Sequence, residues 1–190
     1  TQKADQALAD AKPYTDGEID KVEAVANKNT SDLTALTARV TTAEGDIDTE
    51  LCSRLISAAD GMSVTFHRAF DMCHDPRKAL EKLISLGCHR VLTSGLSATA
   101  EAGIPLLREL VQQADGRIII MPGCGVNSGN ASRILNETGA TEIHASARKS
   151  VGSGMTFRHS GVSMGNPDCD EYARKETDAK EVRAIVNSIS

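Results

Sequence analysis

The sequence contains no tryptophan, and aromatic residues of all kinds make up only 3% of it. Aliphatic side chains must therefore fill the hydrophobic core, as they do in many parallel α/β proteins. No stretch approaches the roughly 18 consecutive apolar residues of a membrane-spanning helix, and the opening TQKADQALAD lacks the apolar run of a signal peptide. We expect no membrane partner and a cytoplasmic location, with the nucleus as a second compartment.

Disulfide-bonded structure is not expected either. The five cysteines are odd in number, dispersed and without a CxxC pair, whereas a disulfide framework favours an even count in a short secreted chain. Reduced thiols in a reducing compartment are the expected state. The five are Cys52, Cys73, Cys88, Cys124 and Cys169.

Basic character is also missing. The net charge is −5, and it is unevenly distributed: residues 1–50 carry a net charge of −6 and the remaining 140 residues carry +1. Nucleic acids and anionic membranes are bound through basic patches. We therefore exclude nucleic acid as the main partner.

Residues 1–45 form the first predicted domain, a long helix with a heptad repeat. The apolar stripe alternates spacings of three and four over about four heptads, with one polar core position, which predicts a coiled coil and a homo-oligomer. Its composition resembles phage tail-fibre coiled coils, which are usually trimeric. A single amphipathic helix packed on the body is the alternative. The stripe comprises Ile19, Val22, Ala26, Asn29, Leu33, Leu36, Val40, Ala43 and Ile47.

Residues 46–190 form the second predicted domain, in which helical and strand patterns alternate. Repeated strand–helix units indicate an α/β fold with a parallel sheet, and the aliphatic run RIIIM predicts a strand buried on both faces. We predict four strands at Val64–Phe70, Arg90–Thr93, Arg117–Met121 and Glu142–Ala147, and helices at Thr49–Ala59, Pro76–Leu86, Ile104–Ala114, Asn130–Thr138 and Glu171–Ile189.

Several motifs in this second domain occur in the order found in one family. They are GDID from Gly45, VTFHRAFD from Val64, RVLTSG from Arg90, MPGCG from Met121, EIHASAR from Glu142, SGM from Ser153 and Phe157-Arg158. From Asp46 onward the chain resembles the second half of the CutC copper-homeostasis family. The resemblance implies a partial (β/α)₈ barrel whose four strands match strands five to eight. Two features depart from the family: the heptad helix stands where the first four units should be, and Cys124 replaces an expected glycine.

The polar residues of the second domain cluster where its predicted strands end. Sites of parallel barrels lie at the carboxyl ends of the strands, and buried polar groups need partners, so this rim is the candidate site. His67 is a candidate acid–base and Arg68 a candidate ligand for a carboxylate or phosphate. Together with Asp71 they form the tentative catalytic set, and a purely structural hydrogen-bonded cluster is the alternative. The predicted ligand-binding set is Thr93, Ser94, Gly123, Gly125, His144, Ser146 and Arg148.

A glycine loop, Gly123-Cys124-Gly125, leaves the third predicted strand and leads to a helix starting near Asn130. Backbone N–H groups in such a loop and at a helix N-terminus can bind an anion. A plain tight turn is the alternative.

Copper enters as the cofactor or cargo implied by the family resemblance. Cu(I) prefers cysteine and methionine sulfur and accepts imidazole. The candidate metal ligands are Cys73, His74, Cys88 and Cys124, although none has the spacing of a dedicated site, and a buried free cysteine is more often a small hydrophobe.

Three functions remain open at this point. The first is a CutC-like protein of cytosolic copper homeostasis that binds Cu(I). The second is a barrel-derived enzyme or binder of a small phosphorylated or carboxylated molecule at the rim. The third is an oligomeric fragment or chimera without activity, because half a barrel leaves sheet edges and interior uncovered. Whether the protein is an enzyme is undecided.

Overall fold

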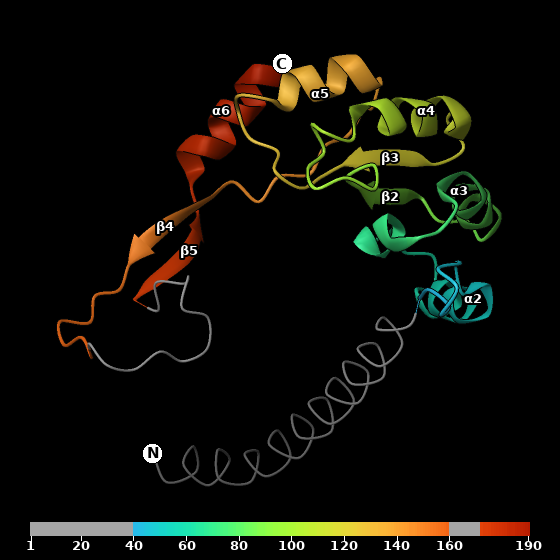
Figure 1. The fold of residues 1–190 in the computed structure, drawn as a ribbon, viewed down its shortest axis with the longest axis horizontal. Helices are drawn as coiled ribbons and strands as arrows, with labels where there is room; N and C mark the ends of the chain where they lie inside the picture. The colour runs from blue at the N-terminus through green and yellow to red at the C-terminus, as the bar shows by residue number, and fades with distance from the viewer. Residues whose placement is uncertain (1–39, 160–171) are drawn as a thin grey trace, which may run out of the picture.

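The structure is a computed structural model that describes residues 40–159 and 172–190. Its elements form a curved row of strand–helix units, followed by a hairpin that projects from it (Figure 1). The heptad helix predicted for residues 1–45 lies almost wholly outside the described residues. No helix in the two described stretches is long and apolar enough to span a bilayer.

The last heptad positions are described, and there the prediction of a helix is wrong. Thr41 and Ile47 form an antiparallel bridge around a tight turn, which Gly45 closes with a φ of +77°. The turn brings Val40 and Ile47 into the core, where they are 5% and 2% exposed. The packed body therefore already includes Val40, because these apolar side chains are buried by a turn rather than by a helical stripe.

Three parallel strands form the sheet, in the order β1 (Thr65–Phe66), β2 (Arg90–Thr93) and β3 (Ile119–Pro122). The register pairs Phe66 with Val91, and Val91 with Ile120. Helices alternate with the strands along the chain, as the pattern predicted: α2 (Thr49–Ala58) precedes β1, α3 (Pro76–Ser85) and α4 (Ile104–Ala114) connect the strands, and α5 (Ala131–Thr138) follows β3. The prediction of an α/β fold with a parallel sheet is confirmed.

Local sequence explains where α3 begins and ends. The Asp75 carboxylate accepts hydrogen bonds from the backbone N–H groups of Arg77 and Lys78, each at 3.1 Å, and Pro76 at the first helical position needs no N–H partner. At the other end Gly87 adopts a φ of +81°, which a residue with a Cβ reaches only at a cost. α3 therefore agrees closely with its prediction.

The first strand is much shorter than predicted. Only Thr65 and Phe66 pair with β2, because the side chain of His67 turns back and accepts a hydrogen bond from the backbone N–H of Ala69 at 3.0 Å. That bond starts a 3₁₀ helix, η1 (Arg68–Met72). The residues expected to continue the strand therefore lie in a helical turn at the end of the sheet.

The fourth predicted strand, Glu142–Ala147, is also wrong. Its described contact with the sheet is one parallel bridge between Gly123 and His144. The chain then leaves the sheet as β4 (Arg148–Gly152), which pairs antiparallel with β5 (Ala173–Thr177). The predicted terminal helix is correspondingly shorter, since β5 precedes α6 (Ala179–Ile189).

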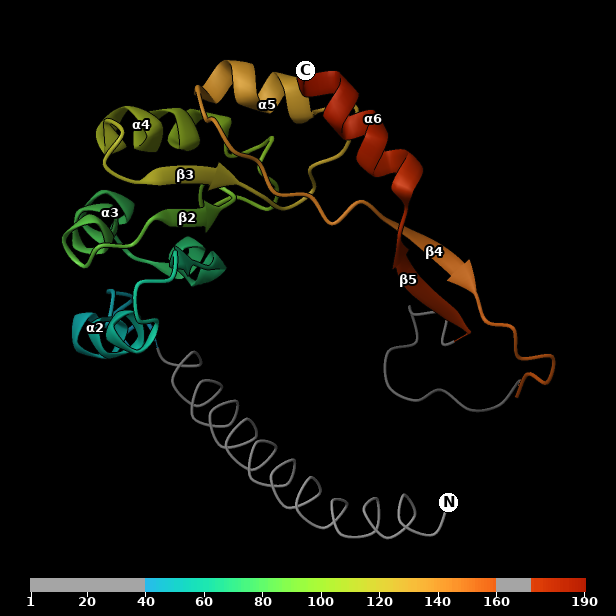
Figure 2. The same ribbon diagram turned by 180° about the vertical axis from the view of Figure 1, so that it is seen from behind.

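The core lies between the sheet and its helices. Figures 1 and 2 show α3, α4 and α5 on the outer side of the curved sheet. Burying each large apolar side chain there contributes about 1.5–3 kcal/mol. The largest fully buried hydrophobic residues are Phe70, Leu80, Leu83, Leu107, Leu110 and Ile134.

The inner face of the sheet is only partly covered. Buried and half-buried residues alternate along β2 and β3, so that Val91 and Ile120 face the helices while Leu92, Ile119 and Met121 are half-buried. The prediction that RIIIM is buried on both faces is therefore wrong within residues 40–159 and 172–190, because no described helix lies over the inner face (Figure 2).

Candidate functional site

Asp71 is the centre of a hydrogen-bonded cluster at the carboxyl end of β2. Its carboxylate accepts the Thr93 hydroxyl at 2.5 Å, the backbone N–H of Ser94 at 3.0 Å and that of Leu96 at 3.2 Å. Arg68 donates its Nε to the same carboxylate at 2.7 Å. The structure thus brings together four of the predicted site residues: Arg68, Asp71, Thr93 and Ser94.

The electrostatics of Asp71 follow from this cluster. Burial alone would raise the pKa of the Asp71 carboxyl, but hydrogen bonds from Thr93, Arg68 and the backbone of Ser94 and Leu96 lower it below its ordinary value. Asp71 is therefore an anionic anchor whose oxygens are engaged within the protein, and its most direct role is to position its neighbours.

Arg68 is the neighbour that faces solvent. Its side chain is 43% exposed, and its Nη2 also donates to the Ser94 hydroxyl at 3.0 Å. The hydrogen bond to Asp71 raises the pKa of Arg68, and the nearby Cys124 thiol contributes in the same direction. A fixed guanidinium with one exposed edge, beside the Gly123-Cys124-Gly125 loop, can receive a carboxylate or phosphate.

His67 is exposed at the start of η1. Because its Nδ1 accepts the Ala69 N–H, the neutral ring carries its proton on Nε2. The ring lies against Phe66, with centroids 5.6 Å apart. His67 therefore has one nitrogen engaged as a helix cap and the other available for proton transfer.

The glycine loop is shaped by close packing. A Cβ on Gly123 would lie 2.5 Å from Cδ1 of Leu92 and 3.3 Å from the Cβ of His144. Cys124 adopts a φ of +86°, where a side chain is strained, and its thiol donates to the backbone oxygen of Ala98 at 3.3 Å. These contacts agree with the tight-turn interpretation of the loop.

The helix N-terminus beyond this loop already has an anionic partner. Ser128 donates its backbone N–H and its hydroxyl to the Glu181 carboxylate of α6, at 2.8 Å and 3.1 Å. An external anion at the start of α5 would therefore compete with Glu181. The Arg68 guanidinium is better placed than this helix N-terminus to bind an external anion.

The remaining predicted ligand-binding residues are not all at the cluster. His144 bridges to Gly123 and is exposed, as is Ser146. Arg148 belongs to β4, which pairs with β5 and not with the parallel sheet. Arg148 lies outside the parallel sheet because the predicted fourth strand does not form there and the chain continues into β4 instead.

The predicted metal ligands do not gather at one point. Across the described residues, no group of three or more histidine, cysteine, aspartate or glutamate side chains has the arrangement of a metal site. Burial raises the pKa of the Cys73 thiol to about 11 and also raises that of Cys88. His74 is exposed, and Cys124 lies in the glycine loop. All four described cysteines are free thiols.

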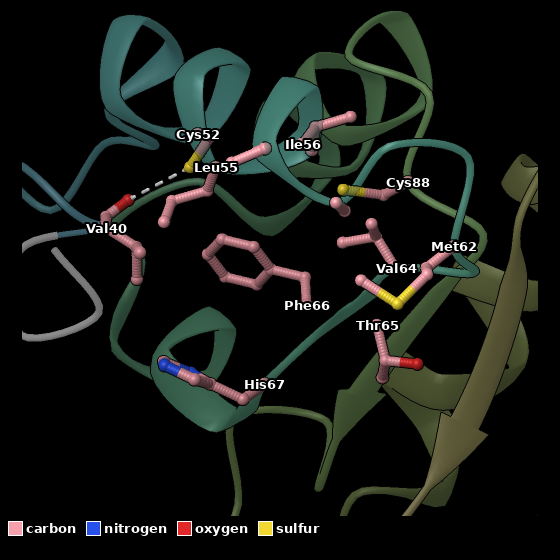
Figure 3. A pocket seen from close by; sticks show the side chains of 12 residues that line it. Val40, Cys52, Leu55, Ile56, Met62, Val64, Thr65, Phe66, His67 and Cys88 are labelled. Atoms are coloured by element: carbon pink, nitrogen blue, oxygen red, sulfur yellow. Dashed lines mark hydrogen bonds between the residues drawn. The ribbon is translucent and has the colours of Figure 1, made fainter. Parts of the chain in front are cut away.

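A second group of soft side chains was missed by the sequence analysis. Cys52 on α2, Cys88 after α3 and Met62 line one cavity of about 260 Å³. Figure 3 shows their three sulfur atoms at separate points of the lining. The only advance signal was that Cys52 lies in the predicted helix Thr49–Ala59, which does not reveal what Cys52 packs against.

A parallel sheet with helices on one face and a polar cluster at its carboxyl end makes this an α/β protein built from strand–helix units. Residues 13–149 match the sequence profile of the CutC family. The chain belongs to that family. The match begins within residues 1–45, which we predicted to be unrelated to it.

The relatives are closely similar in sequence. A CutC family protein of Bacteroides thetaiotaomicron is 54% identical over 149 residues, which are 78% of this chain and 60% of that protein. The human copper homeostasis protein cutC homolog is 52% identical over 145 residues, 76% of this chain and 53% of that protein. The chain thus spans about half to three-fifths of these relatives' length.

A solved structure also resembles this one. The crystal structure of CutC from Streptococcus agalactiae superposes with a TM-score of 0.52 and 36% sequence identity, covering 55% of this chain and 51% of that chain. This similarity supports the α/β arrangement of the parallel sheet and its helices.

Proposed function

We propose that this chain takes part in copper homeostasis by binding Cu(I) through its cysteine thiols in the cytoplasm. Membership of the CutC family supports the copper role, since the human relative is named a copper homeostasis protein. The observation that carries the proposal is that four described cysteines are free thiols and three of them are buried. Buried sulfur ligands suit Cu(I), a soft ion. Copper is here the cargo.

The thiol chemistry predicts how binding depends on pH. Burial raises the pKa of Cys52 and Cys73 to about 11, so the unloaded thiols are protonated at neutral pH. Each thiol must lose its proton to ligate the metal. Affinity for Cu(I) should therefore rise with pH between 6 and 8.

Competition with a chromogenic Cu(I) chelator tests this function. The intact chain should withdraw Cu(I) from the chelator under reducing, oxygen-free conditions, and more strongly at pH 8 than at pH 6. Replacing Cys52, Cys73, Cys88 and Cys124 together by Ala is the control and should abolish the transfer. Equal transfer to the wild type and this variant would overturn the proposal.

A second candidate function is favoured by one observation, the anchored and exposed guanidinium of Arg68. We propose a partial (β/α)₈ barrel that binds, or acts on, a small phosphorylated or carboxylated molecule at the rim containing Arg68, His67 and Ser146. The Asp71 carboxylate holds Arg68 in place, so little side-chain entropy is lost when a ligand binds.

Thermal-shift measurements with sugar phosphates and small carboxylates test this second function. A ligand should raise the melting temperature of the wild type, and Arg68→Ala should remove the shift. Arg148→Ala is the matched control, because Arg148 belongs to β4 and should leave the shift intact. A shift that survives Arg68→Ala contradicts the proposal.

Self-association is the third proposal. The half-buried inner face of the sheet supports a homo-oligomer, because apolar side chains such as Leu92 and Met121 would gain cover from another copy. Light scattering of the intact chain distinguishes the forms: an even number of subunits fits closure by a second sheet, and three fits the predicted coiled coil. A monodisperse monomer would contradict both and would favour an isolated fragment.

A further inference from the structure

We propose that two copies of this chain associate head to tail, with the exposed apolar stripe of α6 in each copy packed against the α2–β1 cavity of the other. The α6 stripe consists of Val182, Val186 and Ile189. The α2–β1 cavity is the space of about 260 Å³ beside Phe66. This inference rests on the proposed self-association and names the two surfaces that meet.

The α2–β1 cavity is an apolar space at one end of the fold. Leu55, Ile56 and Phe66 line it (Figure 3). Met62 also lines it and is 68% exposed, so the cavity opens to the surface. Among the described residues β1 pairs with β2 alone, which leaves the other edge of β1 free. Apolar side chains of a second molecule would therefore be removed from water at this end.

The α6 stripe is a second apolar surface, at the opposite end of the curved row (Figures 1 and 2). Its three side chains are spaced by four and three residues, so they lie on one face of the helix, and they are 41%, 51% and 39% exposed in chain order. Another side of α6 is already packed, since Ile185 is buried and Glu181 accepts two hydrogen bonds from Ser128 before α5. α6 is therefore fixed in place, and its stripe is uncovered within the part of the chain that the structure describes.

Charge makes the two ends complementary. Residues 40–62, which include α2, carry five acidic side chains and one basic side chain, a net charge of −4. β4 together with residues 172–190 carries six basic and three acidic side chains, a net charge of +3. Lys180 and Arg183 of this basic end belong to α6 itself. An acidic end attracts a basic end, whereas two α2 ends or two α6 ends facing each other would repel.

The curvature of the fold allows both ends to be used at once. A second copy related by a two-fold axis would place its α6 at the first copy's α2 and its α2 at the first copy's α6. The closed pair makes the same contact twice, which matters because a stable interface buries roughly 1,200–2,000 Å² in total. Closure also turns the two half-buried inner faces of the sheets towards each other, which is the cover that self-association would supply.

Sedimentation velocity of the intact chain over a range of concentrations tests the two surfaces. Val186→Glu in the α6 stripe and Met62→Glu in the α2–β1 cavity should each weaken the pair at least about 10-fold, because each places a carboxylate in the apolar contact. Met72→Glu is the matched control, since Met72 is 77% exposed and does not line the cavity, and it should associate like the wild type. All three side chains are exposed, so the substitutions leave the core intact.

Mixing the two variants distinguishes head-to-tail association from contacts between like surfaces. In a pair of one Val186→Glu copy and one Met62→Glu copy, one of the two contacts carries both substitutions and the other carries neither. The mixture should therefore associate more tightly than either variant alone, which an unfolded chain could not do. No gain on mixing would overturn the arrangement.

The remaining outcomes separate the surfaces from self-association itself. A pair that Val186→Glu breaks and Met62→Glu leaves intact would be an α6–α6 contact and would overturn the arrangement. A pair that neither substitution weakens would overturn both surfaces while leaving self-association in place. A wild type that stays monomeric at every concentration would instead refute self-association.

Discussion

The Thr93 hydroxyl donates to the Asp71 carboxylate at 2.5 Å and thereby ties the end of β2 to the 3₁₀ helix that follows β1. Asp71 is the residue on which this junction depends. Its side chain is only 7% exposed, and it also accepts hydrogen bonds from Arg68 and from the backbone of Ser94 and Leu96. The rim cluster is therefore held by one buried carboxylate.

Asp71→Asn should destabilise the fold. The amide removes the negative charge opposite Arg68 and places an N–H₂ group against hydrogen-bond donors. We therefore expect the free energy of unfolding to fall by about 3 kcal/mol. Urea unfolding followed by circular dichroism measures the change. Glu142→Gln is a suitable control, because the Arg90–Glu142 pair is half-exposed and its loss should cost less. An equal loss in both variants would contradict the account.

The same carboxylate makes stability depend on pH. The pKa of folded Asp71 lies below its ordinary value, so its contribution is present above about pH 4 and is lost as the pH falls through the folded pKa. The free energy of unfolding of the wild type should therefore fall more steeply than that of Asp71→Asn as the pH is lowered from 5 to 3. The same pH dependence in both proteins would exclude the Asp71 carboxylate as a source of this pH-dependent stability.

Gly123→Ala should lower the free energy of unfolding by about 1–3 kcal/mol, because the new Cβ would lie 2.5 Å from Cδ1 of Leu92. Thermal unfolding measures the loss. Gly152→Ala is the matched control, since no atom lies within 4 Å of its added Cβ. Leu92→Ala in the Gly123→Ala background should recover part of the loss, and the absence of any recovery would show that the contact is not its cause.

Cys124→Gly should stabilise the protein by up to about 1 kcal/mol, because glycine adopts the observed φ of +86° without strain. Cys124→Ala keeps a Cβ and should bring no such gain. Chemical denaturation of both variants separates the backbone effect from loss of the thiol. A gain of the same size in the alanine variant would assign the strain to the sulfur.

Glu181→Ala should destabilise the start of α5 by about 1 kcal/mol, since Ser128 loses both of its carboxylate contacts. Phosphate should then raise the melting temperature of this variant more than that of the wild type, because it can occupy the vacated position. Glu137→Ala is a control within α5 that leaves the contacts of Ser128 untouched. An equal phosphate effect in all three proteins would contradict this interpretation.

Much of the α/β pattern was predictable because local signals determine it. Asp75 and Pro76 predict the start of α3, and Gly139 ends α5 with a φ of +76°. The bounds of β2 agree with the prediction because Val91 and Thr93 alternate with less buried neighbours.

The errors arose where a single contact of one histidine decides the structure, and the sequence pattern does not show that contact. His67 caps η1 instead of extending β1, and His144 bridges to Gly123 without building a fourth strand. β4 and β5 carry no apolar alternation, so they were not recognised as a hairpin.

The rim cluster and the cavity beside α2 show the same distinction. The rim cluster was predictable because parallel strands end at one edge, which brings Arg68, Asp71 and Thr93 together. The cavity that Cys52 and Cys88 both line was not, because it depends on how α2 packs beside β1. Sequence spacing carries no information about that contact.

X-ray absorption spectroscopy of the Cu(I)-loaded chain tests the central claim most directly, because it reads the atoms bound to the metal. The account predicts a first shell of sulfur alone for the wild type, and the loss of that shell when Cys52, Cys73, Cys88 and Cys124 are replaced together by Ala. A shell dominated by nitrogen or oxygen, or a sulfur shell unchanged by removal of the four cysteines, would contradict it.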